Sequence, residues 1–292
     1  MPVAQLTYKD ALVTMKLATL ADGSRDGQLV VVSRDLSLAH LASHIAGTLQ
    51  QLLDDWNFIS PQLEDLYALL NGAKQRHAFA FEPQACLAPL PRAYLFATET
   101  GLARSSQFLP PHGAVDMARL DTGRSAGAAE GASASAGPAG WQAHWVALTG
   151  DVAAGADADT ALDGVRMLLV AATWGARGAV QATAFSPVVV TPDELGSDWQ
   201  GGKVLQTLTV KREAAAQPQA ASNLSNDAGA SPGDAAGFGR RIATLARHQS
   251  LGAGSLVAAP GFEAGQGWVA GSRLHVQAGD GSLLGAIALH AT

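Results

Sequence analysis

The stretch WQAHWVALTG, residues 141–150, predicts a buried β-strand that ends in a turn. Successive side chains of a strand point to opposite faces, so Trp141 and Trp145 share one face with the alanines between and after them. Gln142 and His144 share the other face with Val146 and Leu148. Two polar side chains that point together inside an apolar strand mark the first candidate site of the chain.

The residues around this strand predict a β-rich C-terminal part. Short apolar and β-branched runs separated by glycine-rich turns indicate strands at 168–173, 184–190, 255–258, 267–269, 274–276 and 283–288. Helical spacing indicates helices at 159–167 and 238–248. This order favours a mixed, rolled β-sheet over a doubly wound α/β sheet.

The N-terminal part predicts a small unit of strands and helices. The turn signals Asp22-Gly23 and Asp26-Gly27, which precede the apolar run 29–32, suggest a hairpin, and leucines at helical spacing suggest a helix over Ala39–Trp56. A second helix is predicted from an N-cap at Ser60, with Pro61 in its first position and Gly72 at its end. The fold class is therefore predicted to be α+β and β-rich.

The domain organisation follows from shifts in composition. We expect an N-terminal domain at 15–82, a proline-containing linker at 83–93, and a C-terminal domain at 94–292. Low-complexity tracts at 122–140 and 213–237 are too poor in apolar residues to form part of a core. Residues 1–14 are expected to be an extension, or a consequence of a true start at Met15.

Composition excludes several function classes. The chain has 292 residues, of which 48% are hydrophobic and 15% charged, as in a soluble globular protein. A net charge of −6 without a basic stripe argues against a nucleic-acid partner. A single cysteine, Cys86, permits no internal disulfide, and the apolar runs are too short to span a bilayer. We expect a cytoplasmic protein with no membrane partner.

Several sequence blocks together resemble the fumarylacetoacetate hydrolase family, in its bacterial branch. The turn Thr149-Gly150-Asp151 follows the strand predicted at 141–148, as it does in the family. Further similar blocks are MKLATL with DGSRDG and LVVVSRD at 15–35, APLPRAY at 88–94, ATAFSPVVVTPDELG at 182–196, and LGAGSLV at 251–257. The resemblance implies a rolled β-sheet catalytic-type domain behind a fumarylacetoacetase-type N-terminal domain.

The resemblance also implies a metal site, and this chain departs from it. Family members bind Mg²⁺ or Mn²⁺ through a Glu-x-Glu strand and a later Asp; here those positions fall on Gln142, His144 and Thr173. The family's catalytic lysine falls nearest to Val180, and the only histidine close to the family's acid/base position is His112. The change removes about three negative charges that hard cations require, so no metal cofactor is expected.

Alternatives remain for the two histidines. His144 is expected to form hydrogen bonds in a core that has no ion, and zinc coordination is the alternative. His112 lies among prolines and a glycine, which favours an exposed turn residue over a catalytic base.

Three functions are open at this point. The first is a family member without activity, acting as a binding or assembly partner. The second is a hydrolase of acylpyruvates or related diketo acids that uses rebuilt metal ligands. The third is a metal-free sensor of a 2-oxo or diketo acid. By resemblance, a homodimer is expected in each case.

Overall fold

The computed structural model describes residues 14–72, 76–99, 101–102, 107–116, 140–176, 179–214, 217–218, 222–224, 237–265 and 270–292. Most of the two low-complexity tracts and the strand predicted at 267–269 lie outside these ranges.

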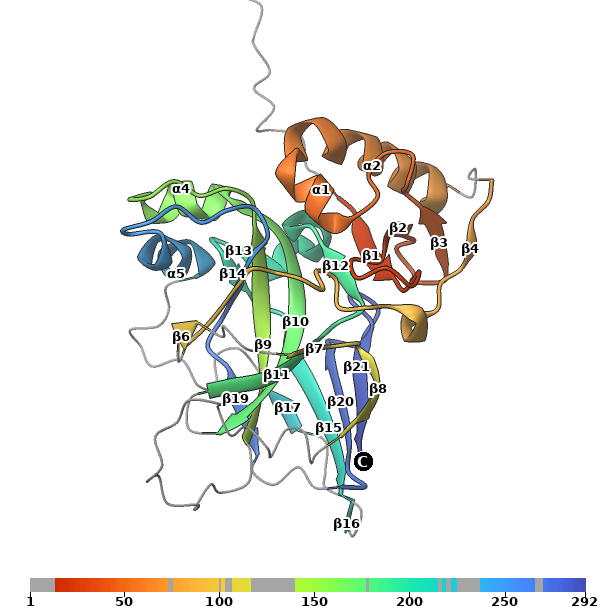
Figure 1. Ribbon diagram of the computed structural model, residues 1–292, viewed down its shortest axis with the longest axis vertical. Helices are drawn as coiled ribbons and strands as arrows, with labels where there is room; N and C mark the ends of the chain where they lie inside the picture. Colours follow the sequence, from red (N-terminus) through yellow and green to blue (C-terminus); the bar gives the residue numbers. More distant parts are fainter. Residues whose placement is uncertain are drawn as a thin grey trace, which may run out of the picture.

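A large mixed sheet runs through the molecule (Figure 1). Its strand order is β4-β3-β2-β1-β12-β10-β9-β18-β5-β6, while β11 pairs with β10 and β7, and β19 pairs with β9. The pairs β18–β5 and β11–β7 are parallel, and the others are antiparallel. The strands are β1 (Lys16–Leu20), β2 (Gln28–Val32), β3 (Leu38–Leu41), β4 (Phe79–Ala80), β5 (Leu95–Thr98), β6 (Gly101–Leu102), β7 (Gln107–Leu109), β9 (Gly140–Thr149), β10 (Val165–Ala176), β11 (Ala179–Phe185), β12 (Val188–Val190), β18 (Ser255–Ala258) and β19 (Phe262–Gly265).

A smaller sheet packs against one face of the large sheet. Its order is β16-β15-β20-β21-β8, and β17 pairs with β15. These strands are β8 (His112–Val115), β15 (Leu208–Ala214), β16 (Gln217–Pro218), β17 (Ser222–Leu224), β20 (Arg273–Ala278) and β21 (Ala286–Ala291). A separate short hairpin joins β13 (Trp199–Gln200) to β14 (Lys203–Val204). Together with the large sheet, they confirm the predicted β-rich α+β class.

Short helices cover the ends and one face of the large sheet. They are α1 (Leu49–Asp54), α2 (Trp56–Asn71), α4 (Ala158–Asp163) and α5 (Phe238–Leu245), with 3₁₀ turns η2 (Pro83–Ala85) and η3 (Pro192–Asp198). Figure 1 shows α1 and α2 over the N-terminal strands, and α4 beside α5 at the other side of the molecule. No helix among the described residues is long and apolar enough to cross a membrane.

Two helix predictions in the N-terminal part were wrong at their starts. The helix expected from Ala39 begins only at Leu49, because residues 38–41 form β3 and complete the sheet beside β2. Thr48 is the true N-cap, since its hydroxyl accepts the amide of Gln51 at 3.3 Å. The second helix begins at Trp56, before the predicted cap, and ends at Gly72 as predicted.

The buried apolar residues form two cores, one on each face of the large sheet. Trp141, Ala143, Trp145 and Ala147 belong to the core that the small sheet covers. Val146 and Leu148 belong to the second core, which α1 and α2 cover. This division confirms the alternation predicted for 141–148, and it follows from the two-residue period of a strand.

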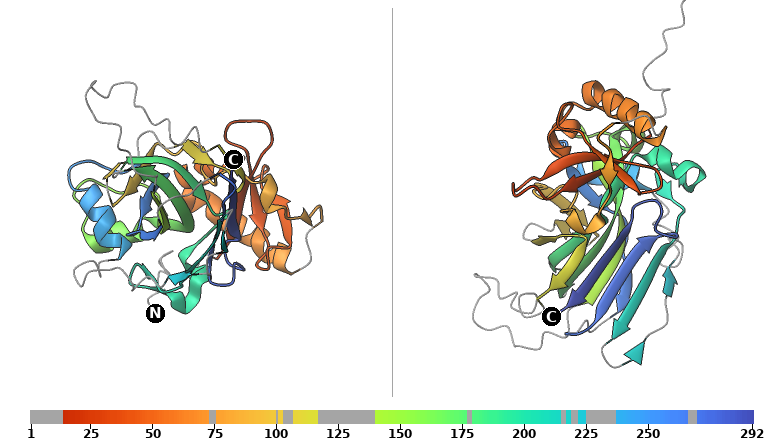
Figure 2. Two further views of the ribbon diagram at one scale, coloured as in Figure 1. Left: turned by 90° about the horizontal axis from the view of Figure 1, so that it is seen from below. Right: turned by 90° about the vertical axis from the view of Figure 1, so that its right-hand side faces the viewer.

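The N-terminal unit is continuous with the rest of the fold. Strand β1 pairs with β12 in the register Lys16↔Val190 to Ala18↔Val188, so one sheet passes from the N-terminal strands into the C-terminal part. The two views of Figure 2 show the helices of this unit on one side and the small sheet extending away from it. The C-terminal strand β21 lies within the small sheet, between β20 and β8.

Candidate functional site

Strands β9 and β10 bring together the three residues singled out from the sequence. They pair antiparallel, with His144 opposite Ala171 and Gln142 opposite Thr173. Residues opposite each other in a ladder share a face, and diagonal neighbours two residues away remain within reach of long side chains. His144 therefore lies diagonally across from Thr173, although the two are 29 residues apart in the chain.

Both ring nitrogens of His144 have protein partners. Nδ1 lies 3.1 Å from the carbonyl oxygen of Ala259, and Nε2 lies 2.8 Å from Oγ1 of Thr173. A carbonyl oxygen only accepts, so Nδ1 is the protonated nitrogen and donates to Ala259. Nε2 then uses its lone pair to accept the Thr173 hydroxyl. A neutral imidazole with this tautomer has no free lone pair for a metal ion.

Burial keeps His144 in this neutral form. The residue is 1% exposed, and its removal from water lowers its pKa from 6.5 to about 4. The hydrogen bond to Ala259 opposes this shift, and the positive charge of Arg241 on α5 adds to it. His144 is thus uncharged at neutral pH, as its hydrogen bonds require.

The segment Ala259–Gly261 covers the imidazole ring. The amide of Ala259 donates to the carbonyl of Trp145 at 2.8 Å, which anchors the segment to β9. A Cβ built on Gly261 would lie 2.2 Å from Cε1 and 2.5 Å from Nδ1 of His144. Only a residue without a side chain fits at this distance, so the ring and the segment close the site together.

An aromatic cluster fills the same face beside His144. Phe185 on β11 lies opposite Ala171, which in turn lies opposite His144, so the three form a row across the sheet. Phe96, Phe108 and Phe185 pack edge to face, with ring centroids 5.0 to 6.2 Å apart. No local sequence pattern marks this cluster, because its members come from three separate strands, β5, β7 and β11.

The residues present do not fit the metal that the family resemblance implies. Mg²⁺ and Mn²⁺ prefer carboxylate oxygens, whereas Gln142, His144 and Thr173 supply an amide, an engaged imidazole and a hydroxyl. Within the part of the chain that the structure covers, no group of three or more His, Cys, Asp or Glu side chains is placed to hold a metal ion. Glu263 on β19 lies at the register position opposite Gln142.

Val180 and His112 lie apart from this site in different ways. Val180 pairs with Gly175 at the far end of the β10–β11 ladder, beyond a register shift after Trp174. A valine side chain has no group that transfers a proton. His112 is on β8, opposite Ala288 of β21, and so belongs to the small sheet.

The prediction that His112 is an exposed turn residue was wrong. The chain pairs there as an added strand of the small sheet, because β21 offers a free edge to residues 112–115. His112 is half-buried, and desolvation lowers its pKa, with a further contribution from His275.

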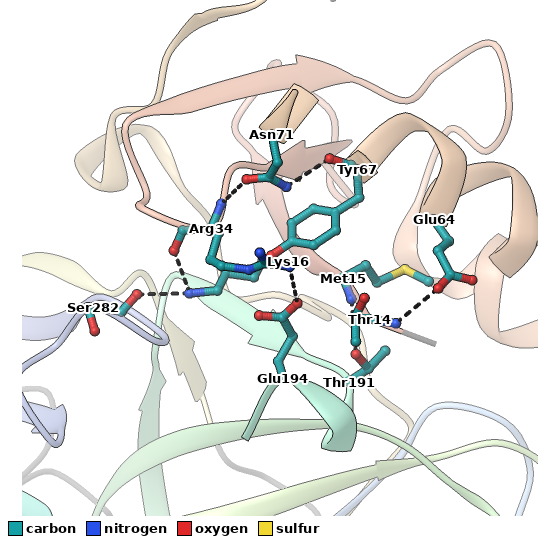
Figure 3. Close-up of polar contacts among 10 residues, drawn as sticks. All are labelled: Thr14, Met15, Lys16, Arg34, Glu64, Tyr67, Asn71, Thr191, Glu194 and Ser282. Atoms are coloured by element: carbon teal, nitrogen blue, oxygen red, sulfur yellow. Dashed lines mark hydrogen bonds and ion pairs between the residues drawn. The ribbon is translucent and has the colours of Figure 1, made fainter. Parts of the chain in front are cut away.

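A second polar cluster joins the N-terminal unit to the C-terminal part (Figure 3). Lys16 on β1 is buried, and its Nζ donates to the carbonyls of Arg34 at 2.8 Å and Ser282 at 2.9 Å. The Arg34 guanidinium lies 3.8 Å from the carboxylate of Glu194 on η3 and over the ring of Tyr67 on α2. Desolvation lowers the pKa of Lys16, and the nearby Glu194 opposes that shift.

The cluster joins strand β1 and helix α2 of the N-terminal unit to the turn η3 of the C-terminal part. Burial first, and then the charge of Glu194, raises the pKa of Tyr67. The arrangement holds the N-terminal unit on the C-terminal part.

Comparisons with known proteins agree with this architecture. Residues 15–92 match the family model described as fumarylacetoacetase N-terminal domain 2. No curated protein matches the chain in sequence. A maleylpyruvate hydrolase from Sphingobium sp. SYK-6, solved with manganese(II) and pyruvate, superimposes with a TM-score of 0.63 at 16% identity, over 95% of this chain and 99% of that chain.

This chain has the fold of that hydrolase. A fumarylacetoacetate hydrolase from Exiguobacterium antarcticum superimposes with a TM-score of 0.58 at 12% identity, over 95% of this chain and 99% of the other. A probable 2-hydroxyhepta-2,4-diene-1,7-dioate isomerase from Mycobacterium abscessus gives 0.60 at 14% identity, over 95% and 98%. The similarity therefore covers 95% of this chain and 98% or more of each of these chains, which are two hydrolases and a probable isomerase.

Proposed function

We propose that this protein is a member of the fumarylacetoacetate hydrolase superfamily that has lost the metal centre and the acylpyruvate hydrolase activity of its relatives. The observation that supports this most directly is the state of His144. Both of its nitrogens are committed, one to Ala259 and one to Thr173, and Gly261 packs on the ring. A metal ion would have to break these bonds and move the covering segment.

The loss extends over the whole set of positions that the resemblance assigns. Gln142, His144 and Thr173 lie together on β9 and β10, and none of them is a carboxylate. Neutral ligands do not replace the charge that offsets dehydration of a hard cation. Val180 occupies the position assigned to the catalytic lysine, and His112 lies on the other sheet. Neither an acid nor a base therefore faces the site from these two positions.

The test measures metal and turnover on the same purified protein. We expect no stoichiometric Mg²⁺ or Mn²⁺ by mass spectrometry, no bound Mn²⁺ by electron paramagnetic resonance, and no loss of acylpyruvate absorbance with either ion added. The triple variant Gln142→Glu, His144→Glu and Thr173→Asp should bind Mn²⁺. The proposal is refuted if the unaltered protein hydrolyses acylpyruvate and the His144→Ala substitution abolishes that turnover.

A second candidate is an active hydrolase with a rebuilt metal site. The observation that favours it is the strand register, in which Glu263 on the neighbouring strand β19 lies opposite Gln142. In that case Mn²⁺ binding and turnover should both be present and should both be lost in Glu263→Gln. The matched control is Glu213→Gln, since Glu213 lies on the small sheet.

A further inference from the structure

The outer face of the small sheet is rich in cationic and imidazole side chains. On β20, Leu274 and Val276 point into the core, so Arg273 and His275 point outward. Lys211 lies opposite His275 on β15, and His290 lies opposite Arg273 on β21. The three strands lie side by side in Figure 1, so these four side chains share one face.

This face is hollowed into a shallow groove of about 740 Å³. His275 on β20, Ala288 on β21 and His112 on β8 form a row across the sheet, with Ala288 in the middle. Because the alanine side chain is small, it leaves space between the two imidazole rings. The side chains that line it include Lys211, Glu213, Arg273, His275, Ala288 and His290.

Two imidazole nitrogens at this row have no hydrogen-bond partner although they are buried. They are Nε2 of His112 and Nδ1 of His275. Desolvation lowers the pKa of both residues, and the neighbouring charges contribute: His275 acts on His112, and Lys211 acts on His275. A buried polar atom without a partner costs free energy that a hydrogen-bonding ligand would recover.

The charges of the groove favour an anion. Lys211 and Arg273 contribute two permanent positive charges, and Glu213 is the acidic residue among those lining it. Glu213 lies 3.8 Å from Arg273, and both side chains are largely exposed, so this pair is weak and Arg273 can turn to a ligand.

We propose that this groove binds the oxyanion group of a small molecule, a carboxylate or a phosphate, through Lys211, Arg273 and the imidazoles of His112 and His275. Charge-assisted hydrogen bonds from the ammonium and guanidinium groups supply most of the affinity. The two imidazole N–H groups orient the oxyanion over Ala288. This site is on a different sheet from His144, and it does not depend on the function proposed above.

Calorimetric titration of the full-length protein with malonate and with inorganic phosphate, at constant ionic strength in chloride, tests the proposal. Saturable binding of at least one of them is expected, and the two probes distinguish a carboxylate ligand from a phosphate ligand. Lys211→Gln and Arg273→Gln should each weaken it about tenfold, the loss of one charge-assisted hydrogen bond. Lys203→Gln is the matched control, because Lys203 is exposed on β14, away from the groove.

Nuclear magnetic resonance locates the ligand. The Hε1 signals of His112 and His275 should move with the same saturation curve as the heat, while those of His144 should stay fixed. The proposal is overturned if neither anion saturates, or if Lys203→Gln weakens binding as much as the groove variants. A saturable heat of anion binding without any change in the chemical shifts of His112 and His275 would also overturn it.

Discussion

The buried histidine of strand β9 and the half-buried histidines of the small sheet differ in how their ring nitrogens are satisfied. His144 on the large sheet has both nitrogens bonded to the protein and is covered by Gly261. His112 and His275 on the small sheet each leave a buried nitrogen without a partner, beside a groove. The difference teaches that burial of a histidine alone does not mark a functional site. A satisfied histidine contributes to stability, and an unsatisfied one is available to a ligand.

Acid should destabilise the protein through His144 more than through the small-sheet histidines. The folded pKa of His144, about 4, lies below 6.5, so protons bind the unfolded chain first. The contribution of His144 to the free energy of unfolding is therefore fully present above pH 6.5. It falls as the pH drops toward 4, by about 3 kcal/mol in total. Urea unfolding at a series of pH values measures this fall. The free energy of unfolding should fall less steeply with decreasing pH in His144→Gln than in the unaltered protein, whereas His112→Gln should keep most of the fall. Equal slopes in the two variants would contradict the comparison.

A side chain at position 261 should disturb the covered site. Gly261→Ala forces a Cβ against the His144 ring, and overpacking of this kind costs about 2 kcal/mol. The control is Gly47→Ala, whose Cβ would meet only the side-chain oxygen of Gln51, at 3.2 Å. In a His144→Ser background the penalty at 261 should shrink, and a penalty of the same size there would show that the ring is not the cause.

Loss of the hydroxyl at position 173 should have a smaller effect. Thr173→Val keeps the shape but leaves Nε2 of His144 unsatisfied, which costs about 1 to 2 kcal/mol. Thr173→Ser restores the hydroxyl and should recover most of the free energy of unfolding. Chemical denaturation of the three proteins measures both effects, and no recovery in the serine variant would refute the hydrogen-bond argument.

The smallest effect is expected on the small sheet. His275→Leu removes an imidazole that has an unsatisfied nitrogen, so the free energy of unfolding should change by less than about 0.5 kcal/mol. The same substitution should weaken anion binding in the groove. A large loss of stability would mean that His275 is a structural residue like His144, and the contrast between the two faces would disappear.

Much of the fold was predictable from local patterns. The alternation of 141–148 predicted both faces of β9, and the run 255–258 predicted β18 with its bounds. The predicted helix start at Ala39 failed, because a short apolar run does not by itself distinguish a strand from a helix, and the pairing of residues 39–41 with β2 decided for the strand. The resemblance predicted that Gln142, His144 and Thr173 matter together, and the register of β9 with β10 brings them together.

By itself the sequence determined which side chains share a face, because alternation along a strand is a local property that needs no partner. It also determined that no carboxylate stands at 142, 144 or 173. Only the tertiary structure decided what those side chains bind and where His112 lies. Thr173, Ala259 and Gly261 meet His144 across three separate segments, and His112 meets Ala288 from 176 residues away, through sheet pairings that no local pattern encodes.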